Sequence, residues 1–498
     1  MYMIFSEKKV CELYSGFKSK AVKYYNKREW SLSIKYLEAA AYTAYSFYFN
    51  EKDDEIEKGI QQISECIIKR VDYEIRSNRC VFYDSHGNDK GALTQQYIRA
   101  IISTGWDMLY IVDKAKPDEK FLPIYYELKQ HSEKVKILFV PKNLTGLNKI
   151  QFIYDSIVDW HADKLFMHLY PWSCSAIAAF LSLPATITKY HINHTDHTYW
   201  AGVSCVDYNF EFREYGCNVS VHNRGISQSK LLLLPYYPIE SDEKFHGFPF
   251  DPDGKIIIFS GGAYYKTFDE HDTFLKICKA LLDIDIRVII VYAGFGDGNE
   301  FKNRISQNGI TERFYMLGYR NDLSAIFDHS DFFLNSYPIN GGLMCSYAAM
   351  HSVPILAYYS GKNVKPESII CQNGYVEISS SSIEALVNKA HTLFDNLRER
   401  EEYGKSIRNC CIMPDEFNNS FIASVNTGLT QYPFSINDRF KKPELNRKST
   451  IDLYNKNKQF QKNLVHILGS AEMFFAYPVM YTEAMLGRFN TLIKKLLR

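Results

Sequence analysis

The segment Ser336–Pro354 (SYPINGGLMCSYAAMHSVP) combines a glycine turn with the start of a helix. An expected strand over 331–335 leads into the turn, in which Asn340, Gly341 and Gly342 open the helix. Glycines let the backbone approach a ligand closely, and the free N–H groups and dipole of a helix N-terminus favour a phosphate. An ordinary strand-to-helix connection has the same composition. The segment alone therefore leaves a phosphate site and a plain turn equally open.

Histidines cluster in Tyr190–Gly202 (YHINHTDHTYWAG), which holds three histidines and one aspartate within seven residues. His191, His194, Asp196 and His197 are metal-ligand types, but their spacing suits one helix face only roughly, and the Thr and Asn residues favour a strand that runs into a loop. A neutral histidine in a cleft can instead take a proton from an acceptor hydroxyl or bind phosphate. We predict no metal site and predict catalytic histidines in the order His194, His197, His191, with at least one of them structural.

Strand and helix patterns alternate from Asn78 onward and must position these residues. The expected strands of the first part are 79–83, 107–112, 136–140 and 164–167, and the rhythm continues through 176–183 and 185–192. Such alternation indicates a parallel sheet that is covered by helices on both faces.

A second α/β half follows Ile239–Lys255 (IESDEKFHGFPFDPDGK), which is rich in Pro, Gly and charge and is the expected linker. Its expected strands are 256–259, 287–292, 314–317, 331–335 and 354–358, separated by helices over 268–283, 300–308, 322–327 and 344–350 and followed by one over 382–397. Two such halves imply a cleft where ligands meet the carboxyl ends of the strands.

Both ends of the chain are expected to be helical, over residues 1–76 and 431–498. Apolar residues recur at helical spacing between Trp30 and Ala41, and this region resembles one tetratricopeptide-like hairpin, which must pack on the next domain to bury its face. The basic, amphipathic stretch Leu486–Arg498 suits either contact with an anionic membrane or packing back onto the first half. We expect the packing.

The composition of the 498 residues is that of a folded protein, with 46% hydrophobic and 23% charged residues. The 58 Lys and Arg residues nearly equal the 57 Asp and Glu residues in number. The net charge is therefore too small to give the protein an overall positive potential that would favour nucleic acid as a ligand. The eleven scattered cysteines, an odd number, indicate a reducing compartment. The N-terminus lacks the pattern of a signal peptide, and apolar runs have strand length, so a cytoplasmic protein is expected.

A family resemblance rests on the order SYPINGG (336–342), AAM (348–350) and VPI (353–355). This order resembles the nucleotide-sugar half of GT-B glycosyltransferases, whose motif runs Pro, an acidic residue, a Gly-rich turn, Glu-Ala-Met and Gly-x-Pro. The two glutamates of the retaining E-x7-E pattern fall on Asn340 and Ala348, so both are absent. The Asn-Gly start is more similar to the O-GlcNAc transferase and bacterial adhesin-glycosyltransferase branch.

The resemblance implies a donor site in the second half. In IIIFSGGAYYK (256–266), Lys266 is expected to neutralise the diphosphate of the leaving nucleotide, a surface lysine being the alternative. AGFGDG (293–298) and LGYRND (317–322) match places that enclose the nucleoside, with Asn321 and Asp322 also expected beside the base. Arg224 resembles a motif residue of bacterial polysaccharide enzymes and is expected to contact phosphate or form a surface ion pair. The expected donor-binding residues are Lys266, Gly261, Gly262, Gly318, Tyr319, Asn340, Gly341, Gly342 and Arg224.

The acceptor is expected in the first half. Tyr190–Gly202 is similar to an N-H-x-D-H-x-[FY]-W stretch of some bacterial polysaccharide glycosyltransferases, which supports the histidine prediction. The loop Asp84–Gly91 (DSHGNDKG) follows the first strand, and Asp89 and Lys90 are its expected acceptor contacts, although any such loop holds similar residues.

The resemblance as a whole implies an α/β protein of GT-B fold, with two Rossmann-like domains that face across a cleft, an N-terminal helical extension and C-terminal helices. The expected division is a helical region 1–76, an acceptor-side domain 77–240, a nucleotide-sugar-binding domain 241–430 and C-terminal helices 431–498.

The expected activity is sugar transfer from a nucleotide sugar, a UDP-sugar first, in surface polysaccharide or glycan assembly and without a required cofactor. The acceptor is a glycan, a lipid-linked molecule or a polypeptide, and nucleic acid is not a partner. The expected location is cytoplasmic, with peripheral contact at the inner face of the membrane as an option. The alternatives are a protein glycosyltransferase, a UDP-sugar epimerase and an inactive sugar-binding protein of the same fold.

Overall fold

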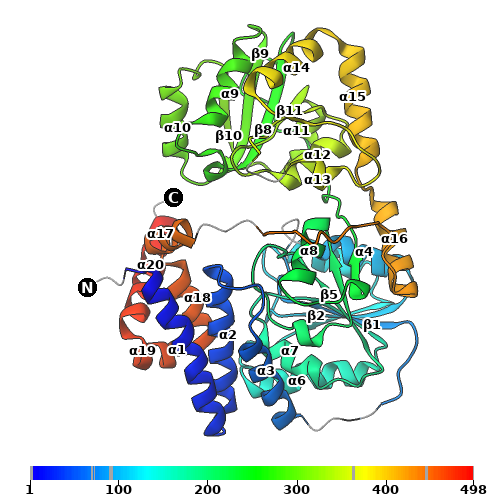
Figure 1. The fold of residues 1–498 in the computed structure, drawn as a ribbon, viewed down its shortest axis with the longest axis vertical. Helices are drawn as coiled ribbons and strands as arrows, with labels where there is room; N and C mark the ends of the chain where they lie inside the picture. Colours follow the sequence, from blue (N-terminus) through cyan, green and yellow to red (C-terminus); the bar gives the residue numbers. More distant parts are fainter. Residues whose placement is uncertain are drawn as a thin grey trace. The chain divides into compact units, whose positions relative to one another are not determined.

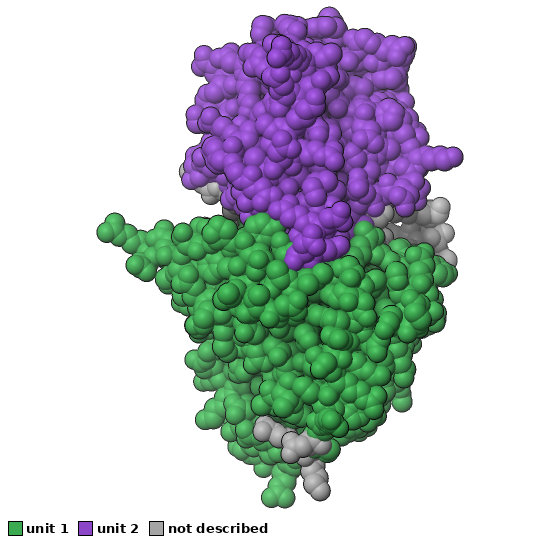
Figure 2. Space-filling view, turned by 90° about the vertical axis from the view of Figure 1, so that its right-hand side faces the viewer, with its two compact units in different colours: residues 1–234, 420–498 green, residues 235–419 purple. Residues whose placement is uncertain are grey.

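The computed structural model describes residues 4–68, 71, 73–88, 93–361, 365–442 and 447–496. The chain forms two compact units (Figures 1 and 2). Unit 1 comprises residues 1–234 and 420–498, and unit 2 comprises residues 235–419. Unit 1 thus contains both ends of the chain, including the helical regions that the sequence predicts there.

Unit 1 is built on a parallel sheet in the order β3-β2-β1-β4-β5-β6-β7. Its strands are β1 (Arg79–Asp84), β2 (Asp107–Val112), β3 (Val135–Phe139), β4 (Lys164–His168), β5 (Thr188–Ile192), β6 (Tyr208–Glu211) and β7 (Leu231–Leu233). Continuous apolar runs form the central strands because both of their faces are buried. The helices between the strands are α4 (Thr94–Ser103), α5 (Leu122–Lys129), α6 (Leu147–Trp160), α7 (Cys174–Leu181) and α8 (Glu214–His222), with short 3-10 turns η1 (Val203–Cys205) and η2 (Gln228–Lys230).

Helices from the two ends of the chain pack on one another in unit 1 (Figure 1). They are α1 (Glu7–Asn26), α2 (Trp30–Ser46) and α3 (Asp54–Ile67), with α17 (Arg447–Asn457), α18 (Gln459–Leu468), α19 (Ser470–Ala476) and α20 (Pro478–Leu496). Aromatic rings join them: Phe460 stacks on Tyr42 with 5.2 Å between centroids, and Phe17 meets Tyr477 at 5.5 Å. The N-terminal hairpin therefore buries its apolar face partly against C-terminal helices that the sequence did not pair with it.

Helix α16 (Pro414–Thr427) brings the chain back to unit 1. Phe421, in the part of α16 that belongs to unit 1, is buried among rings of the sheet and of α4. Its ring lies 5.4 Å from that of Phe166, 5.7 Å from that of Phe210 and 5.8 Å from that of Tyr97. The core of unit 1 is therefore completed by residues that follow unit 2 in the sequence.

Unit 2 has a second parallel sheet, in the order β10-β9-β8-β11-β12-β13. Its strands are β8 (Ile256–Ala263), β9 (Val288–Phe295), β10 (Phe314–Gly318), β11 (Phe332–Leu334), β12 (Ile355–Tyr358) and β13 (Ser379–Ser380). Its helices are η3 (Tyr264–Thr267), α9 (Thr273–Leu282), α10 (Gly298–Gln307), α11 (Leu323–Asp328), α12 (Gly342–Met350), α13 (Glu367–Ile370), α14 (Ile383–Asp395) and α15 (Leu397–Cys410). The fold class predicted from the sequence, with two Rossmann-like sheets and helical ends, is confirmed.

One predicted boundary in unit 2 is wrong. The sequence predicts a strand over 256–259 that ends before Gly261 and Gly262, whereas β8 runs through both residues to Ala263. Gly261 pairs with Ala293 and Gly262 with Gly294 on β9. The pairing is possible because the glycines lack side chains: a Cβ on Gly294 would lie 2.2 Å from the carbonyl oxygen of Gly262. The glycines serve close packing of two strands and do not end the first of them.

This packing predicts a stability effect. Gly294→Ala is expected to destabilise unit 2 by about 1–3 kcal/mol, because the added methyl also meets the rings of Tyr292 and Tyr264. Far-UV circular dichroism during urea unfolding measures the change. Gly298→Ala is the matched control, because a Cβ there has only ordinary contacts beyond 3.7 Å and costs little. Equal unfolding midpoints for the two variants would contradict the prediction.

Candidate functional site

In each sheet there is a point, the direction change, where the order of strand addition reverses, so that the next strand is placed on the other side of the first one. In unit 2 the strands β10, β9 and β8 lie on one side, and the chain then crosses to β11 on the other side of β8. Loops that follow two such neighbouring strands diverge and leave a crevice at their carboxyl ends, where ligands of open α/β sheets bind. The loop after β8 carries Lys266, and the loop after β11 carries Ser336–Gly342. The sequence-predicted donor residues on these two loops are therefore at the position that the fold favours for a ligand.

Side-chain hydrogen bonds hold the turn between β11 and α12 in place. The Asn335 Oδ1 atom accepts a hydrogen bond from the backbone N–H of Gly341 at 3.0 Å, and its amide donates to Asn340 Oδ1 at 2.8 Å. The hydroxyl of Ser336 donates to the carbonyl of Ile339 at 2.7 Å. Helix α12 begins directly after this turn, at Gly342, and the first N–H groups of a helix have no partner within it. The turn thus presents the N-terminus of a nine-residue helix to the crevice.

Lys266 lies close to this helix N-terminus. Its carbonyl accepts a hydrogen bond from the N–H of Ile339 at 3.2 Å, which ties the loop after β8 to the turn after β11. Burial lowers the pKa of the Lys266 amine, and the thiol of Cys345 in the first turn of α12 opposes that shift. Apart from the Cys345 thiol, no group influences the Lys266 amine among the described residues, and it has no hydrogen bond or ion pair there. A bound diphosphate would favour the charged form of this amine and supply its partner.

Exposed aromatic residues stand at the ends of neighbouring strands. Tyr319 follows β10 and is 77% exposed, and Phe295 ends β9 and is 60% exposed. Gly318 has a φ of +69°, a backbone conformation that glycine adopts without strain, and turns the chain at this point. Asp322, which the sequence places beside the base, is buried and accepts hydrogen bonds from Arg320 and from the N–H of His246. Its carboxylate therefore fixes the loop, while the exposed rings are free to stack on a planar ligand.

The direction change in unit 1 lies between β1 and β4. His86 follows β1, His168 ends β4, and His194 follows β5, the next strand along the sheet. One ring nitrogen of each of the three imidazoles lies within 4.8 Å of the other two. Of the histidines predicted from the sequence, His194 belongs to this cluster, whereas its two partners were missed. The signal that could have found them is the position of each at the carboxyl end of an expected parallel strand.

The other two predicted histidines have different surroundings. His191 is buried within β5, where its Nδ1 atom lies 2.7 Å from Asn209 Oδ1 and its ring stacks on Trp200 at 4.0 Å. Burial lowers the pKa of His191 to about 3, so the ring is neutral at pH 7. His197 is partly exposed, and its Nδ1 atom lies 3.2 Å from a carboxylate oxygen of Asp196. The structure thus places His191 as a core side chain and leaves His197 beside the surface.

Arg224 is buried under the histidine loop. Its guanidinium donates to the carbonyls of Thr195, Asp196 and Thr198 at 3.2, 3.1 and 2.7 Å. It also donates to the hydroxyl of Ser220 at 3.2 Å, and that hydroxyl in turn bonds to Glu211. With 1% of its surface exposed, Arg224 shapes the loop 195–198 from within and is neither a surface ion pair nor placed to meet a phosphate from solvent.

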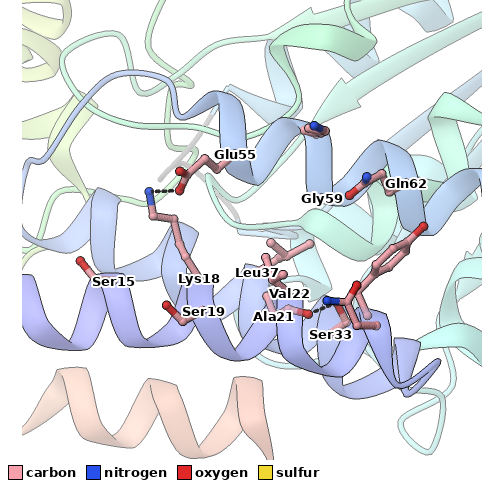
Figure 3. A pocket seen from close by; sticks show the side chains of 13 residues that line it. Ser15, Lys18, Ser19, Ala21, Val22, Ser33, Leu37, Glu55, Gly59 and Gln62 are labelled. Atoms are coloured by element: carbon pink, nitrogen blue, oxygen red, sulfur yellow. Dashed lines mark hydrogen bonds and ion pairs between the residues drawn. The ribbon is translucent and has the colours of Figure 1, made fainter.

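Two remaining features do not join these sites. Asp89 and Lys90, the expected acceptor contacts, lie outside the described residues. A groove of about 810 Å³ lies among α1, α2 and α3 (Figure 3). Its charged groups are Lys58 and the ion pair of Lys18 with Glu55 at 2.6 Å. These helices stand outside both sheets, so the groove is separate from the strand ends that carry the candidate residues.

Comparison with known proteins agrees with this architecture. Residues 254–396, most of unit 2, match the family model of the glycosyl transferases group 1. No curated protein matches the chain in sequence. A glycosyltransferase from Rickettsia africae is similar in structure, with 12% identity, a TM-score of 0.52, and coverage of 70% of this chain and 98% of that one.

Two further solved structures have a TM-score of 0.50. One is the Anabaena protein HepE in complex with UDP and glucose, with 11% identity over 70% of this chain and 99% of that one. The other is an O-GlcNAc transferase variant from Thermobaculum terrenum, with 12% identity over 79% of this chain and 77% of that one. The protein has the GT-B fold. Residues 254–396 of its second unit match the sequence pattern of the glycosyl transferases group 1.

Proposed function

We propose that this protein transfers a sugar from a nucleotide-sugar donor, a UDP-sugar first, to an acceptor in the assembly of a surface polysaccharide or glycan. The observation that carries the proposal is the position of Lys266 at the direction change of unit 2, where its carbonyl is bonded to the turn that opens α12. Lys266, Gly341 and Gly342 bind the diphosphate, while Gly318 and Tyr319 enclose the nucleoside. The HepE structure with UDP and glucose supports UDP as the nucleotide.

The chemistry follows from charge. When the bond between the anomeric carbon and the diphosphate breaks, negative charge accumulates on the leaving nucleotide. A lysine and the amides of a helix N-terminus stabilise that charge because they are already oriented toward it. No metal is required at the donor for this step, and a histidine of unit 1 takes the proton from the acceptor hydroxyl. His194 is the first candidate for that role.

The acceptor is a glycan, a lipid-linked molecule or a polypeptide. The structural similarity to an O-GlcNAc transferase supports a polypeptide as one of these possible acceptors. No helix among the described residues is long and apolar enough to cross a membrane. We propose a cytoplasmic protein that meets lipid-linked acceptors at the inner face of the membrane.

A donor panel tests the proposal. The full chain is incubated with UDP-, GDP- and CMP-sugars, with and without lipid-linked or peptide acceptors, and free nucleotide and product are measured. Release of UDP that depends on an acceptor, with the sugar found on that acceptor, is the expected result. Binding of no donor would overturn the proposal and favour an inactive protein of this fold. Conversion of the sugar configuration without transfer would favour an epimerase.

A further inference from the structure

The three histidines at the direction change of unit 1 form a close group. The ring centroid of His86 lies 4.4 Å from that of His168 and 4.3 Å from that of His194, and the last two are 5.4 Å apart. No hydrogen bond joins any two of these rings among the described residues. The three imidazoles come from three separate strand ends, and their nitrogens lie within 4.8 Å of one another. Two explanations are open: the nitrogens share a common partner, or the rings pack for aromatic contact alone.

Hydrogen bonds select which nitrogen of His168 faces the group. Its Nδ1 atom lies 3.2 Å from Asp84 Oδ1, so Nδ1–H donates to the carboxylate and the lone pair is on Nε2. His168 is fully buried, and its Nε2 atom has no hydrogen-bond partner in the described structure. An unpaired, buried nitrogen lone pair is costly unless a ligand occupies it.

Asp84 is held as an acceptor for His168. Its carboxylate also accepts hydrogen bonds from the N–H groups of His86 and Gly87, at 2.8 and 3.0 Å, and from the hydroxyls of Thr94 and Tyr110. A carboxylate that fixes the far nitrogen of a ligand histidine is the usual second layer of a protein metal site.

His86 and His194 meet the remaining requirements of a ligand. The Nε2 atom of His86 lies 3.2 Å from the carbonyl of Leu169, which makes Nε2 the protonated nitrogen and leaves the lone pair on Nδ1. The ring of His194 meets that of His86 edge to face, with 4.3 Å between the centroids. Imidazole binds metal ions through the lone pair of a neutral ring.

We propose that His86, His168 and His194 bind one divalent transition-metal ion, with Zn²⁺ as the preferred species. Imidazole nitrogens suit Zn²⁺, and a set of three protein ligands leaves one position for water or for an oxygen of the acceptor. His194 is only partly buried, so the open position can be reached from solvent. The lone pair of His194 cannot both bind the metal and take the proton of the acceptor, so this inference replaces the proton-acceptor role proposed above for His194. It does not depend on the identity of the donor.

Metal titration of the full chain tests the site. The protein is stripped with EDTA and titrated with Zn²⁺ by calorimetry and with Co²⁺ by visible absorption, which reports nitrogen coordination. One equivalent is expected to bind and to raise the thermal midpoint. His168→Ala and His194→Ala are each expected to weaken binding by about 100-fold or more, since each removes a ligand. Absence of binding to the stripped wild-type protein would overturn the proposal.

Matched variants separate a metal site from structural histidines. His197→Ala changes the same loop but lies outside the group, so it is expected to keep one equivalent and the same affinity. Circular dichroism in EDTA establishes that each variant is folded. His194→Ala decides the question if His168→Ala does not fold, because the His194 side chain is partly exposed. Unchanged Zn²⁺ affinity in a folded His194→Ala protein would also overturn the proposal.

Discussion

Replacing Lys266 with alanine is expected to lower kcat/KM for the donor by about 100- to 1,000-fold. Lys266 is tied to the turn that opens α12, and its amine has no hydrogen-bond or ion-pair partner among the described residues. Under the proposed function, its loss removes one preorganised charge from the leaving diphosphate. Affinity for free UDP is expected to fall by about 10- to 100-fold, as for the loss of one hydrogen bond to a charged group. Nucleotide release under initial-rate conditions and calorimetry with UDP measure the two effects.

Two further variants make this result specific. Lys266→Met keeps most of the apolar stem and removes the charge, so it is expected to behave like the alanine variant. Lys276→Ala removes an exposed lysine of α9 in the same unit and is expected to leave both quantities unchanged. Full activity in both Lys266 variants would refute the diphosphate assignment without bearing on the fold.

Arg224→Met is expected to destabilise unit 1 by about 3–5 kcal/mol, since it leaves a buried carboxylate without its compensating charge. Burial raises the pKa of Glu211 to about 7, and the positive charge of Arg224 opposes that rise. The substitution also leaves the carbonyls of Thr195, Asp196 and Thr198 without their donor. All five tryptophans of the chain lie before residue 235, so tryptophan fluorescence during urea unfolding reports on unit 1 alone.

The loss of unfolding free energy caused by Arg224→Met is expected to depend on pH. A folded-state pKa above the unfolded value means that the native state holds the proton more tightly, so stability falls as pH rises between about 4 and 7. Without Arg224 the pKa of Glu211 rises further, and the fall continues to higher pH. The deficit is therefore expected to be larger at pH 8 than at pH 5. Arg76→Met, an exposed change in the same unit, is expected to stay within about 0.5 kcal/mol at both values.

The sequence predicted the sheets well because apolar runs and intervening helical patterns are local signals. The strand 107–112 is found unchanged as β2, and 314–317 differs from β10 by one residue. The error at Gly261 and Gly262 has a different origin. Glycine indicates either a turn or a close approach of two strands, and only the pairing partner on β9 distinguishes the two.

The residues of the candidate sites also differ in whether a local sequence pattern indicates them. The predicted donor residues around Gly341 lie in one contiguous motif, so a local pattern was sufficient to propose them. The histidine group has no such local pattern: its sequence signal is only that each histidine stands at the carboxyl end of a strand, and His86 and His168 meet after the chain has crossed the sheet and returned beside β1. The role of Arg224 was also hidden, since burial beneath the loop 195–198 depends on tertiary packing and not on its neighbours in sequence.

The placement of Phe421 constrains how the protein is made. Residues 235–419 leave the ribosome before the segment that carries Phe421, so unit 2 can complete its sheet while unit 1 still lacks part of its aromatic core. The strands of unit 1 are synthesised first, but their core is completed only when helix α16 has been synthesised. A chaperone that shields apolar surface during translation would act on unit 1, although unit 1 begins to appear first.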